Sequence, residues 1–232
     1  MQKCEQIEMP NNIIVAIDGP AGAGKSTVAR QIAEALNLLY VDTGAMYRAL
    51  TLKALQQGVD LTDGQALTEL AEKTKIRLAS EPGQIQKVYC DAQDVTAQIR
   101  TPEVSRYVAQ VSQFPGVREH MLRLQRLAGQ SGGMVMDGRD IGSRVFPEAH
   151  FKFFITASYP ARVWRRQQEM RAKGFDPNPA ELEKEMIERD LTDRNREVGP
   201  LIQVPDAVVI DTTELSIEEV VGKMLEIING GR

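Results

Sequence analysis

The amino-acid sequence predicts an α/β fold of three layers, in which helices cover both faces of a five-stranded parallel sheet. Five short apolar runs alternate with segments of helical periodicity along the 232 residues. Strands that alternate with helices form parallel sheets, because each helix carries the chain back to the start of the next strand. The composition agrees with this fold, since 42% hydrophobic and 26% charged residues are usual for a globular protein with a sizeable core.

The first elements are a strand, a glycine-rich turn and a helix within 25 residues. The run IIVAID at 13–18 is apolar almost throughout, which is typical of a strand buried on both faces. From Gly24 the apolar residues recur at helical spacing as far as Leu36. A second strand at 38–41 leads into a helix that ends near Gly58.

Residues 59–100 look like an insertion, because they combine a polar helix at 64–74 with a small hairpin whose turn spans 81–84. The regular alternation then resumes, and the last helix begins with a capping box of Ser216 and Glu219. The later elements predicted are helices at 103–112 and 117–128, strands at 134–136 and 151–156, a helix from Pro160 to about Gly174, a helix at 180–195, a strand at 207–211 and the last helix.

The turn after the first strand matches the phosphate-loop pattern GxxxxGK[ST]. Small residues let successive backbone N–H groups turn toward phosphates, while the lysine reaches the β and γ oxygens and the serine hydroxyl ligates magnesium. A glycine turn that merely links two elements is the alternative, but the strand and helix stand where phosphate binding requires them. The matching residues are Gly19, Pro20, Ala21, Gly22, Ala23, Gly24, Lys25 and Ser26.

Among nucleotide-binding classes, a small-molecule kinase is favoured. A GTPase switch would need a guanine-reading NKxD segment, and the sequence contains none. A helicase-type ATPase would need more chain for its partner surfaces than 232 residues provide.

Positive charge is concentrated in residues 139–173, which hold eight basic and three acidic residues in a chain of formal net charge −4. Arg165 and Arg166 are candidates for neutralising a transferred phosphoryl group from a mobile lid. Arg171 and Lys173 fit a solvated helix face equally well.

Two further groups of charged residues are site candidates. Asp137-Gly138-Arg139-Asp140 follows a buried strand, and open α/β sheets present ligand-binding groups at the carboxyl ends of their strands. Arg189, Asp193 and Arg196 are spaced to share one face of a helix, which fits either a site or a surface salt-bridge ladder, and spacing alone leaves both open.

Other classes of protein are disfavoured. The acidic balance and pI near 5.4 argue against a protein that coats nucleic acid. Cys4 and Cys90 are far apart and His120 and His150 lack metal-ligand spacing, so neither a disulfide framework nor a zinc site is expected. No signal peptide or membrane span is evident, so we expect a cytoplasmic protein, monomeric by default, without nucleic-acid or membrane partners.

Four blocks in this order resemble the bacterial cytidylate kinases: IDGPAGAGKST, VDTGAMYRAL, DGRDIGSRVFP and RDLTDRNREVGPL. The resemblance covers nearly the whole chain. It implies a single P-loop kinase domain over 1–232, of the nucleoside-monophosphate kinase architecture. The implied parts are a core at 13–42, 111–160 and 197–232, a monophosphate-binding lobe with an insertion at 43–110, and a short lid region at 161–196.

The resemblance also implies the reaction, in which ATP phosphorylates CMP or dCMP with the help of Mg²⁺. A kinase for another monophosphate such as UMP is the first alternative, and a nucleotide-dependent binding switch is the second. Lys25, Arg139 and Arg196 are the implied catalytic residues, and Gly19 to Thr27 with Arg165 would bind ATP. The implied CMP-binding residues are Thr43, Arg48, Arg118, Arg139, Asp140, Arg189, Asp193 and Arg196.

The chemistry expected of these residues needs no general base, because a phosphate oxygen with a second pKa near 6 is already ionised at neutral pH. Asp140 could accept a hydrogen bond from the cytosine amino group and would face an oxygen in uracil. Ser26 would ligate Mg²⁺, with Asp42 or Asp137 acting through water. Thr43 and Ala109 stand where other members carry serine, and Ala109 leaves base selectivity more dependent on Arg118 and Asp140.

Overall fold

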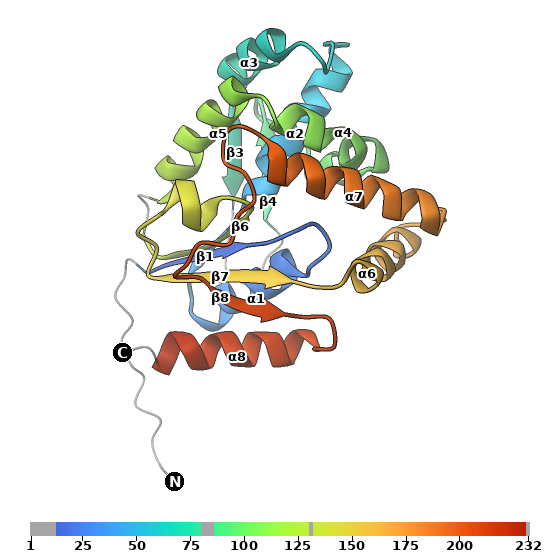
Figure 1. Cartoon of the computed structure of the whole chain (residues 1–232). Coiled ribbons are helices and arrows are strands. Elements are labelled where there is room, and N and C mark those ends of the chain that lie inside the picture. The colour runs from blue at the N-terminus through green and yellow to red at the C-terminus, as the bar shows by residue number, and fades with distance from the viewer. Residues whose placement is uncertain (1–12, 80–85, 130–131, 231–232) are drawn as a thin grey trace.

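The computed structural model describes residues 13–79, 86–129 and 132–230. Five parallel strands form the central sheet in the order β2-β6-β1-β7-β8, as predicted (Figure 1). The strands are β1 (Ile14–Asp18), β2 (Leu39–Asp42), β6 (Met134–Gly138), β7 (Phe151–Thr156) and β8 (Val208–Asp211). The central strands β1 and β6 are buried along almost their whole length, which explains their unbroken apolar sequence.

Helices cover both faces of this sheet and make three layers. On one face, α1 (Lys25–Ala35) and α8 (Ile217–Gly230) enclose a core that includes Ile32, Phe153 and Met224. On the other face of the sheet, apolar residues of the strands pack against α5 (Pro115–Ala128) and the π-helical turn η3 (Ile141–Val145). The capping box of α8 is confirmed by two reciprocal hydrogen bonds between Ser216 and Glu219.

A second apolar core lies among the helices above the sheet in Figure 1. It is formed by α2 (Thr43–Gln56), α3 (Gly64–Lys73), α4 (Pro102–Ser112) and α5. The predicted hairpin is a three-stranded antiparallel sheet of β3 (Ile76–Ala79), β4 (Lys87–Cys90) and β5 (Gln93–Asp94), followed by the 3₁₀ turn η1 (Gln98–Arg100). Its predicted turn at 81–84 lies outside the described residues.

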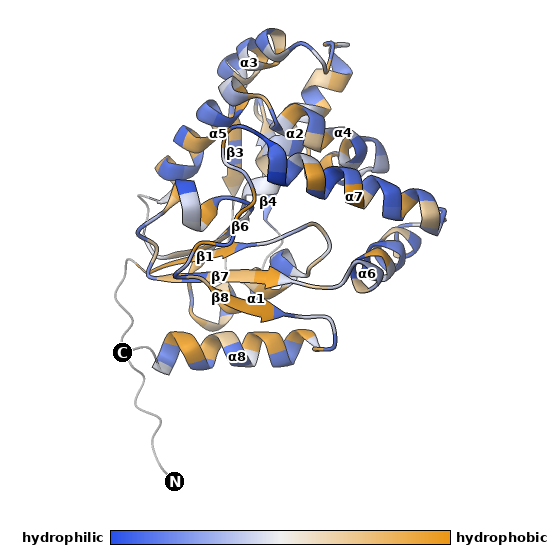
Figure 2. Ribbon diagram, viewed as in Figure 1, coloured by the Kyte–Doolittle hydropathy of each residue, from blue (hydrophilic) through white to orange (hydrophobic). Residues whose placement is uncertain are grey.

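The remaining helices, α6 (Tyr159–Ala172) and α7 (Pro179–Asn195), pack against each other at the side of the sheet. Figure 2 shows mainly hydrophilic residues on α6, in contrast to the hydrophobic strands. α7 also contacts α4, so the pair bridges the sheet and the second core.

The structure also bears on the expectations about the cysteines and about membrane-spanning segments. Cys90 is a free, buried cysteine, and Cys4 lies outside the described residues. Within residues 13–79, 86–129 and 132–230, no helix has both the length and the apolar character needed to cross a bilayer.

Candidate active site

The phosphate loop joins β1 to α1 as predicted, and Gly24 is the N-cap of the helix. Gly22 and Gly24 have φ angles of 75° and 91°, which side chains with a Cβ rarely adopt. The loop therefore turns its backbone toward the start of α1, where unpaired N–H groups and the helix dipole favour an anion.

Lys25 lies at this helix start with its side chain folded back over the loop. Its Nζ donates to the Pro20 carbonyl oxygen at 2.7 Å and is buried. Burial and the positive charge of Arg139 lower the pKa of Lys25 to about 7. An ammonium group in this position has one fixed acceptor and would gain strongly from a bound polyphosphate.

Ser26 donates to the Asp137 carboxylate at 2.8 Å, and Tyr40 donates to the other Asp137 oxygen at 2.9 Å. The carboxylates of Asp137 and Asp42 lie on adjacent strands at the same register. Burial first, and then repulsion from Asp42, raise the pKa of Asp137 to about 6.

The residues around Ser26 fit a magnesium ion held in part through water. A hydroxyl oxygen beside a buried carboxylate is a hard oxygen donor set, and the neighbouring carboxylate adds negative charge that a cation would relieve. No cluster of three or more potential metal-ligating side chains occurs in the described part of the chain. The donor set thus suits an ion that arrives with phosphate oxygens of its own.

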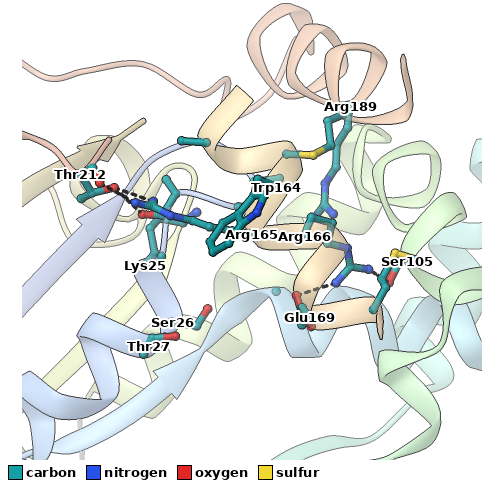
Figure 3. Close-up of a pocket in the computed structure, with 18 of the residues that line it drawn as sticks. Lys25, Ser26, Thr27, Ser105, Trp164, Arg165, Arg166, Glu169, Arg189 and Thr212 are labelled. Carbon is teal, nitrogen blue, oxygen red and sulfur yellow. Dashed lines mark hydrogen bonds and ion pairs between the residues drawn. The ribbon is translucent and has the colours of Figure 1, made fainter. Parts of the chain in front are cut away.

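A pocket of about 1130 Å³ opens in front of Lys25 and Ser26 (Figure 3). Its walls come from the phosphate loop, α2, α4, α6, α7 and the segment after β8. The basic side chains that line it are Lys25, Arg30, Arg48, Arg100, Arg106, Arg139, Arg165, Arg166 and Arg189.

Crowding of positive charge is visible in the acid–base properties of this lining. Burial and repulsion from Arg189 lower the pKa of Arg48 to about 9. Burial and repulsion from Arg139 lower the pKa of Arg189 to about 10. A bound polyanion would relieve the repulsion among these positive charges, so the pocket favours a ligand with several negative charges.

Arg165 and Arg166 lie on α6 and both line the pocket, but they face different elements. Arg165 donates to the hydroxyl and carbonyl oxygens of Thr212, after β8, at 2.9 and 2.5 Å. Arg166 donates to the Ser105 hydroxyl of α4 at 3.1 Å and pairs with Glu169 at 2.8 Å. Arg171 and Lys173 do not line the pocket and pair with Asp176 and Glu169.

A buried ionic cluster lies beside the pocket and contains four of the predicted residues. Arg118 pairs with Asp140 at 2.5 Å, and Arg196 pairs with Asp193 at 3.0 Å. Arg139 lines the pocket and donates to Asp193 at 2.8 Å, so it links the pocket to this cluster. Arg118, Asp140, Asp193 and Arg196 themselves do not line the pocket.

The alternative of a surface salt-bridge ladder is wrong for the predicted trio, because Asp193 and Arg196 are buried. The prediction that all three project from one helix also needs correction. α7 ends at Asn195, and Arg196 has an extended backbone with φ −63° and ψ 145°. Its guanidinium donates to the Gly199 carbonyl oxygen at 2.6 Å in addition to pairing with Asp193.

The cluster contains buried donors that have no hydrogen-bond acceptor among the described residues, namely Arg118 Nε and Arg196 Nη2, although the latter lies 3.9 Å from Asp140. Arg189 Nε, on the pocket wall, is in the same position. Buried donors without acceptors cost free energy, and they commonly mark places where a ligand supplies the missing oxygen or nitrogen.

Thr43 and Asp42 stand between the strand and α2. Thr43 donates to the Asp137 carbonyl oxygen at 2.8 Å, and it is buried behind the pocket lining. Asp42 caps α2 through the Ala45 amide at 2.9 Å and pairs with Arg100 at 3.3 Å. Both residues therefore hold α2 in register with the carboxyl ends of β2 and β6.

Several residues of the site were missed from the sequence. Asp18 accepts from the Ile141 and Gly142 amides at 2.9 and 2.8 Å, and burial raises its pKa to about 6. The rule that pointed to Asp137 after its strand could have pointed to Asp18 as well. Others had no local signal, and these are Tyr40, Gln86, Arg100, Ser105, Arg162, Asp190 and Thr212.

Comparison with known proteins extends these observations over the whole chain. The family model described as cytidylate kinase matches residues 15–230. A cytidylate kinase of Bacillus velezensis is 52% identical over 221 residues, which cover 95% of this chain and 98% of that protein. A cytidylate kinase of Desulforamulus reducens is 50% identical over 224 residues, with 97% and 100% covered.

A solved structure supports the fold alone. The crystal structure of an uncharacterized protein from Eubacterium ventriosum superposes with a TM-score of 0.51 at 12% identity, and the match covers 94% of this chain and 98% of that one. The family model matches almost the whole chain, and the relatives are about 50% identical to it along nearly their full length. The chain belongs to the cytidylate kinase family.

Proposed function

We propose that the protein transfers the γ-phosphoryl group of ATP to CMP or dCMP, giving ADP and CDP or dCDP. The observation that carries the proposal is the junction at Arg139. This arginine lines the pocket in front of the phosphate loop and is hydrogen-bonded to the buried ionic cluster that contains Arg118 and Asp140. A phosphate site and a base-reading site would thus meet at one residue.

The donor phosphates would bind along the loop from Gly19 to Thr27. Their oxygens would accept from the backbone amides at the start of α1, and Lys25 would exchange the Pro20 carbonyl for the β and γ oxygens. Arg165 would approach from α6 with the rest of the 161–196 segment, acting as a lid.

Mg²⁺ would be held by the Ser26 hydroxyl, with Asp137 or Asp42 ligating through water. When bound, it would neutralise negative charge on the donor phosphates and help to align them. The hydroxyl of Tyr40 keeps one Asp137 oxygen fixed while the other faces Ser26.

The acceptor would bind with its phosphate against Arg48, Arg139 and the Thr43 hydroxyl. Arg189 and Asp193 would face its ribose. The cytosine amino group would donate a hydrogen bond to Asp140. The ring nitrogen or carbonyl oxygen of cytosine would accept one from Arg118 Nε, which has no acceptor among the described residues. Because Arg118 and Asp140 lie behind the pocket lining, this binding requires the 43–110 lobe and the core to shift relative to each other.

The chemical step is an in-line attack by an oxygen of the CMP phosphate on the γ-phosphorus of ATP. The nucleophile is already ionised at neutral pH and needs no general base. Lys25, Arg139 and Arg196 would neutralise the charge that spreads over the transferred group, while lid closure excludes water.

A coupled assay of ADP formation with CMP, dCMP, UMP and AMP as acceptors tests the proposal. We expect CMP and dCMP to be phosphorylated with the highest kcat/KM and Lys25→Ala to lose turnover while it stays folded. Release of ADP at the same rate without any monophosphate would refute the kinase function, and preference for UMP or AMP would refute the choice of acceptor.

A further inference from the structure

The chain contains a single tryptophan, Trp164, and the proposed function does not use it. Its side chain lies on α6 and is 62% exposed, yet it lines the pocket. A large aromatic ring in water is costly, and one placed at the edge of a ligand pocket is a frequent means of binding a flat ligand.

The direction of Trp164 follows from its two neighbours on the helix. Successive residues of an α-helix are about 100° apart around its axis. Arg165 faces Thr212 after β8, and Arg166 faces Ser105 on α4. Trp164 therefore lies on the side of Arg165 that is turned away from α4, and Figure 3 shows its ring beside the Arg165 side chain, which reaches to Thr212.

This side of the pocket is joined directly to the phosphate loop. The Thr212 hydroxyl contacts the Ala23 carbonyl oxygen at 3.2 Å as well as Arg165. The opposite side, toward Arg48 and Ser105, carries the proposed acceptor site. The nucleoside of the phosphoryl donor is thus left with the space between α6 and the segment after β8.

Beyond Thr212 the lining of that space mixes small polar and aliphatic residues. They are Thr213, Glu214, Leu215, Ser216, Ile217 and Val220. Trp164 is the aromatic member of the pocket lining, and no cation is recorded over its ring among the described residues. A flat base could lie against the indole face without displacing another group.

We infer that Trp164 stacks on the purine base of the phosphoryl donor and sets the preference for a purine over a pyrimidine donor. The inference rests on the proposed function for the identity of the donor side. Stacking tolerates different bases because each has a π face, and a larger base gains more contact. ATP and GTP should both engage Trp164, and UTP should do so more weakly.

Because Trp164 is the only tryptophan, all tryptophan fluorescence of the full chain comes from this position. We expect ATP or a non-hydrolysable ATP analogue with Mg²⁺ to change the emission and to protect the indole from acrylamide quenching. Sodium tripolyphosphate should compete with ATP for binding without giving this protection. Equal protection by tripolyphosphate would assign the change to lid closure and overturn the inference.

Kinetics supply a second readout. Trp164→Leu should raise the KM for ATP about fivefold or more while the KM for CMP stays within twofold, and Trp164→Phe should retain most of the affinity. Phe175→Leu is a matched control, since Phe175 is an exposed aromatic residue near the end of α6 that does not line the pocket. An unchanged ATP KM in Trp164→Leu would overturn the inference.

The two proposals fail in different ways. If CMP is phosphorylated but ATP leaves the fluorescence of Trp164 and its accessibility to acrylamide unchanged, the stacking contact is absent and the kinase function stands. If ATP protects Trp164 but no monophosphate is phosphorylated, the stacking contact stands and the proposed function fails.

Discussion

Arg118 Nη2 lies 2.5 Å from Asp140 Oδ2, and both side chains are buried. Arg118 also donates to the Ser112 carbonyl oxygen at 3.2 Å, so its guanidinium is fixed at the C-terminal end of α4. A buried ion pair is often no better for stability than a pair of well-packed apolar residues. Its presence beside the pocket, with Arg118 Nε left without an acceptor, fits a role in recognising the acceptor base.

Asp140→Asn should shift acceptor preference from CMP toward UMP. An amide can donate to the uracil oxygen, whereas the carboxylate only accepts, and one such exchange changes discrimination by about 1–3 kcal/mol, or roughly 5- to 150-fold. The ratio of kcat/KM for CMP and UMP measures the effect. The KM for ATP should not move.

Asp206→Asn is the charge-matched control for this substitution, because its exposed carboxylate pairs with Lys152 away from the site. This variant should keep the CMP/UMP ratio of the parent. If Asp140→Asn also keeps that ratio, Asp140 does not read the base.

Binding of ATP at pH 8 should be accompanied by uptake of about one proton. Burial and Arg139 lower the pKa of Lys25 to about 7 in the free protein, so most of its amine is neutral at pH 8. Phosphate oxygens next to Nζ favour the charged form and raise this pKa. Titration calorimetry in buffers of different ionisation enthalpy measures the proton uptake.

Lys25→Arg provides the comparison, because arginine keeps its charge and should bind ATP without taking up the proton. Binding to the parent at pH 8 with no net proton change would mean that Lys25 is already charged or does not meet the phosphates.

The predictability of the site depended on how far apart in the chain its parts are. Lys25, Ser26 and the glycines were identifiable because the phosphate loop is a continuous segment whose geometry depends on neighbouring residues. The contact of Arg118 with Asp140 spans 22 residues, and that of Arg139 with Asp193 spans 54. A local sequence pattern cannot reveal contacts between residues so far apart. The sequence therefore indicated which residues belong to the cluster but not which of them form ion pairs.

The fold shows the same division. All five core strands were predictable because each is a continuous apolar run, although only Ile210 of the edge strand β8 is buried. The π-helical turn at Ile141–Val145 was missed because its first amides are held by Asp18, which lies 123 and 124 residues away. The short strand β5 was missed because it is exposed and two residues long.

Asp137→Asn should stabilise the free protein at neutral pH while lowering turnover. The pKa of Asp137 is raised from 3.8 to about 6, so the folded protein holds this proton more tightly than the unfolded chain does. The carboxyl group therefore contributes stability below pH 4 and loses it as the pH rises through 6, by about 3 kcal/mol in all. Asparagine is neutral throughout and can still accept from Tyr40.

Urea unfolding without nucleotide or Mg²⁺, at several pH values between 4 and 7, measures this difference. The free energy of unfolding of Asp137→Asn minus that of the parent should increase with pH. A difference that stays constant across the range would show that the carboxylate pays no burial penalty in the free protein.

Arg162 and Asp190 form a fully buried ion pair at 2.7 Å that joins α6 to α7. Arg162 also donates to the Ala21 carbonyl oxygen of the phosphate loop at 3.0 Å, so it connects α6 and α7 to this loop. Removing one member of a buried pair leaves an uncompensated charge and costs about 3–5 kcal/mol. We expect Arg162→Met and Asp190→Leu each to destabilise the protein by about this amount.

The double variant should lose much less than the sum of the two single losses, because it buries no unpaired charge. The exposed pair Lys184 and Glu188 on α7 is the control cycle, and its coupling should stay below about 0.5 kcal/mol. The double variant should also show a raised KM for ATP, since the loop has lost its contact with Arg162 even where folding is restored. Strict additivity of the single variants would rule out a coupled ion pair between α6 and α7.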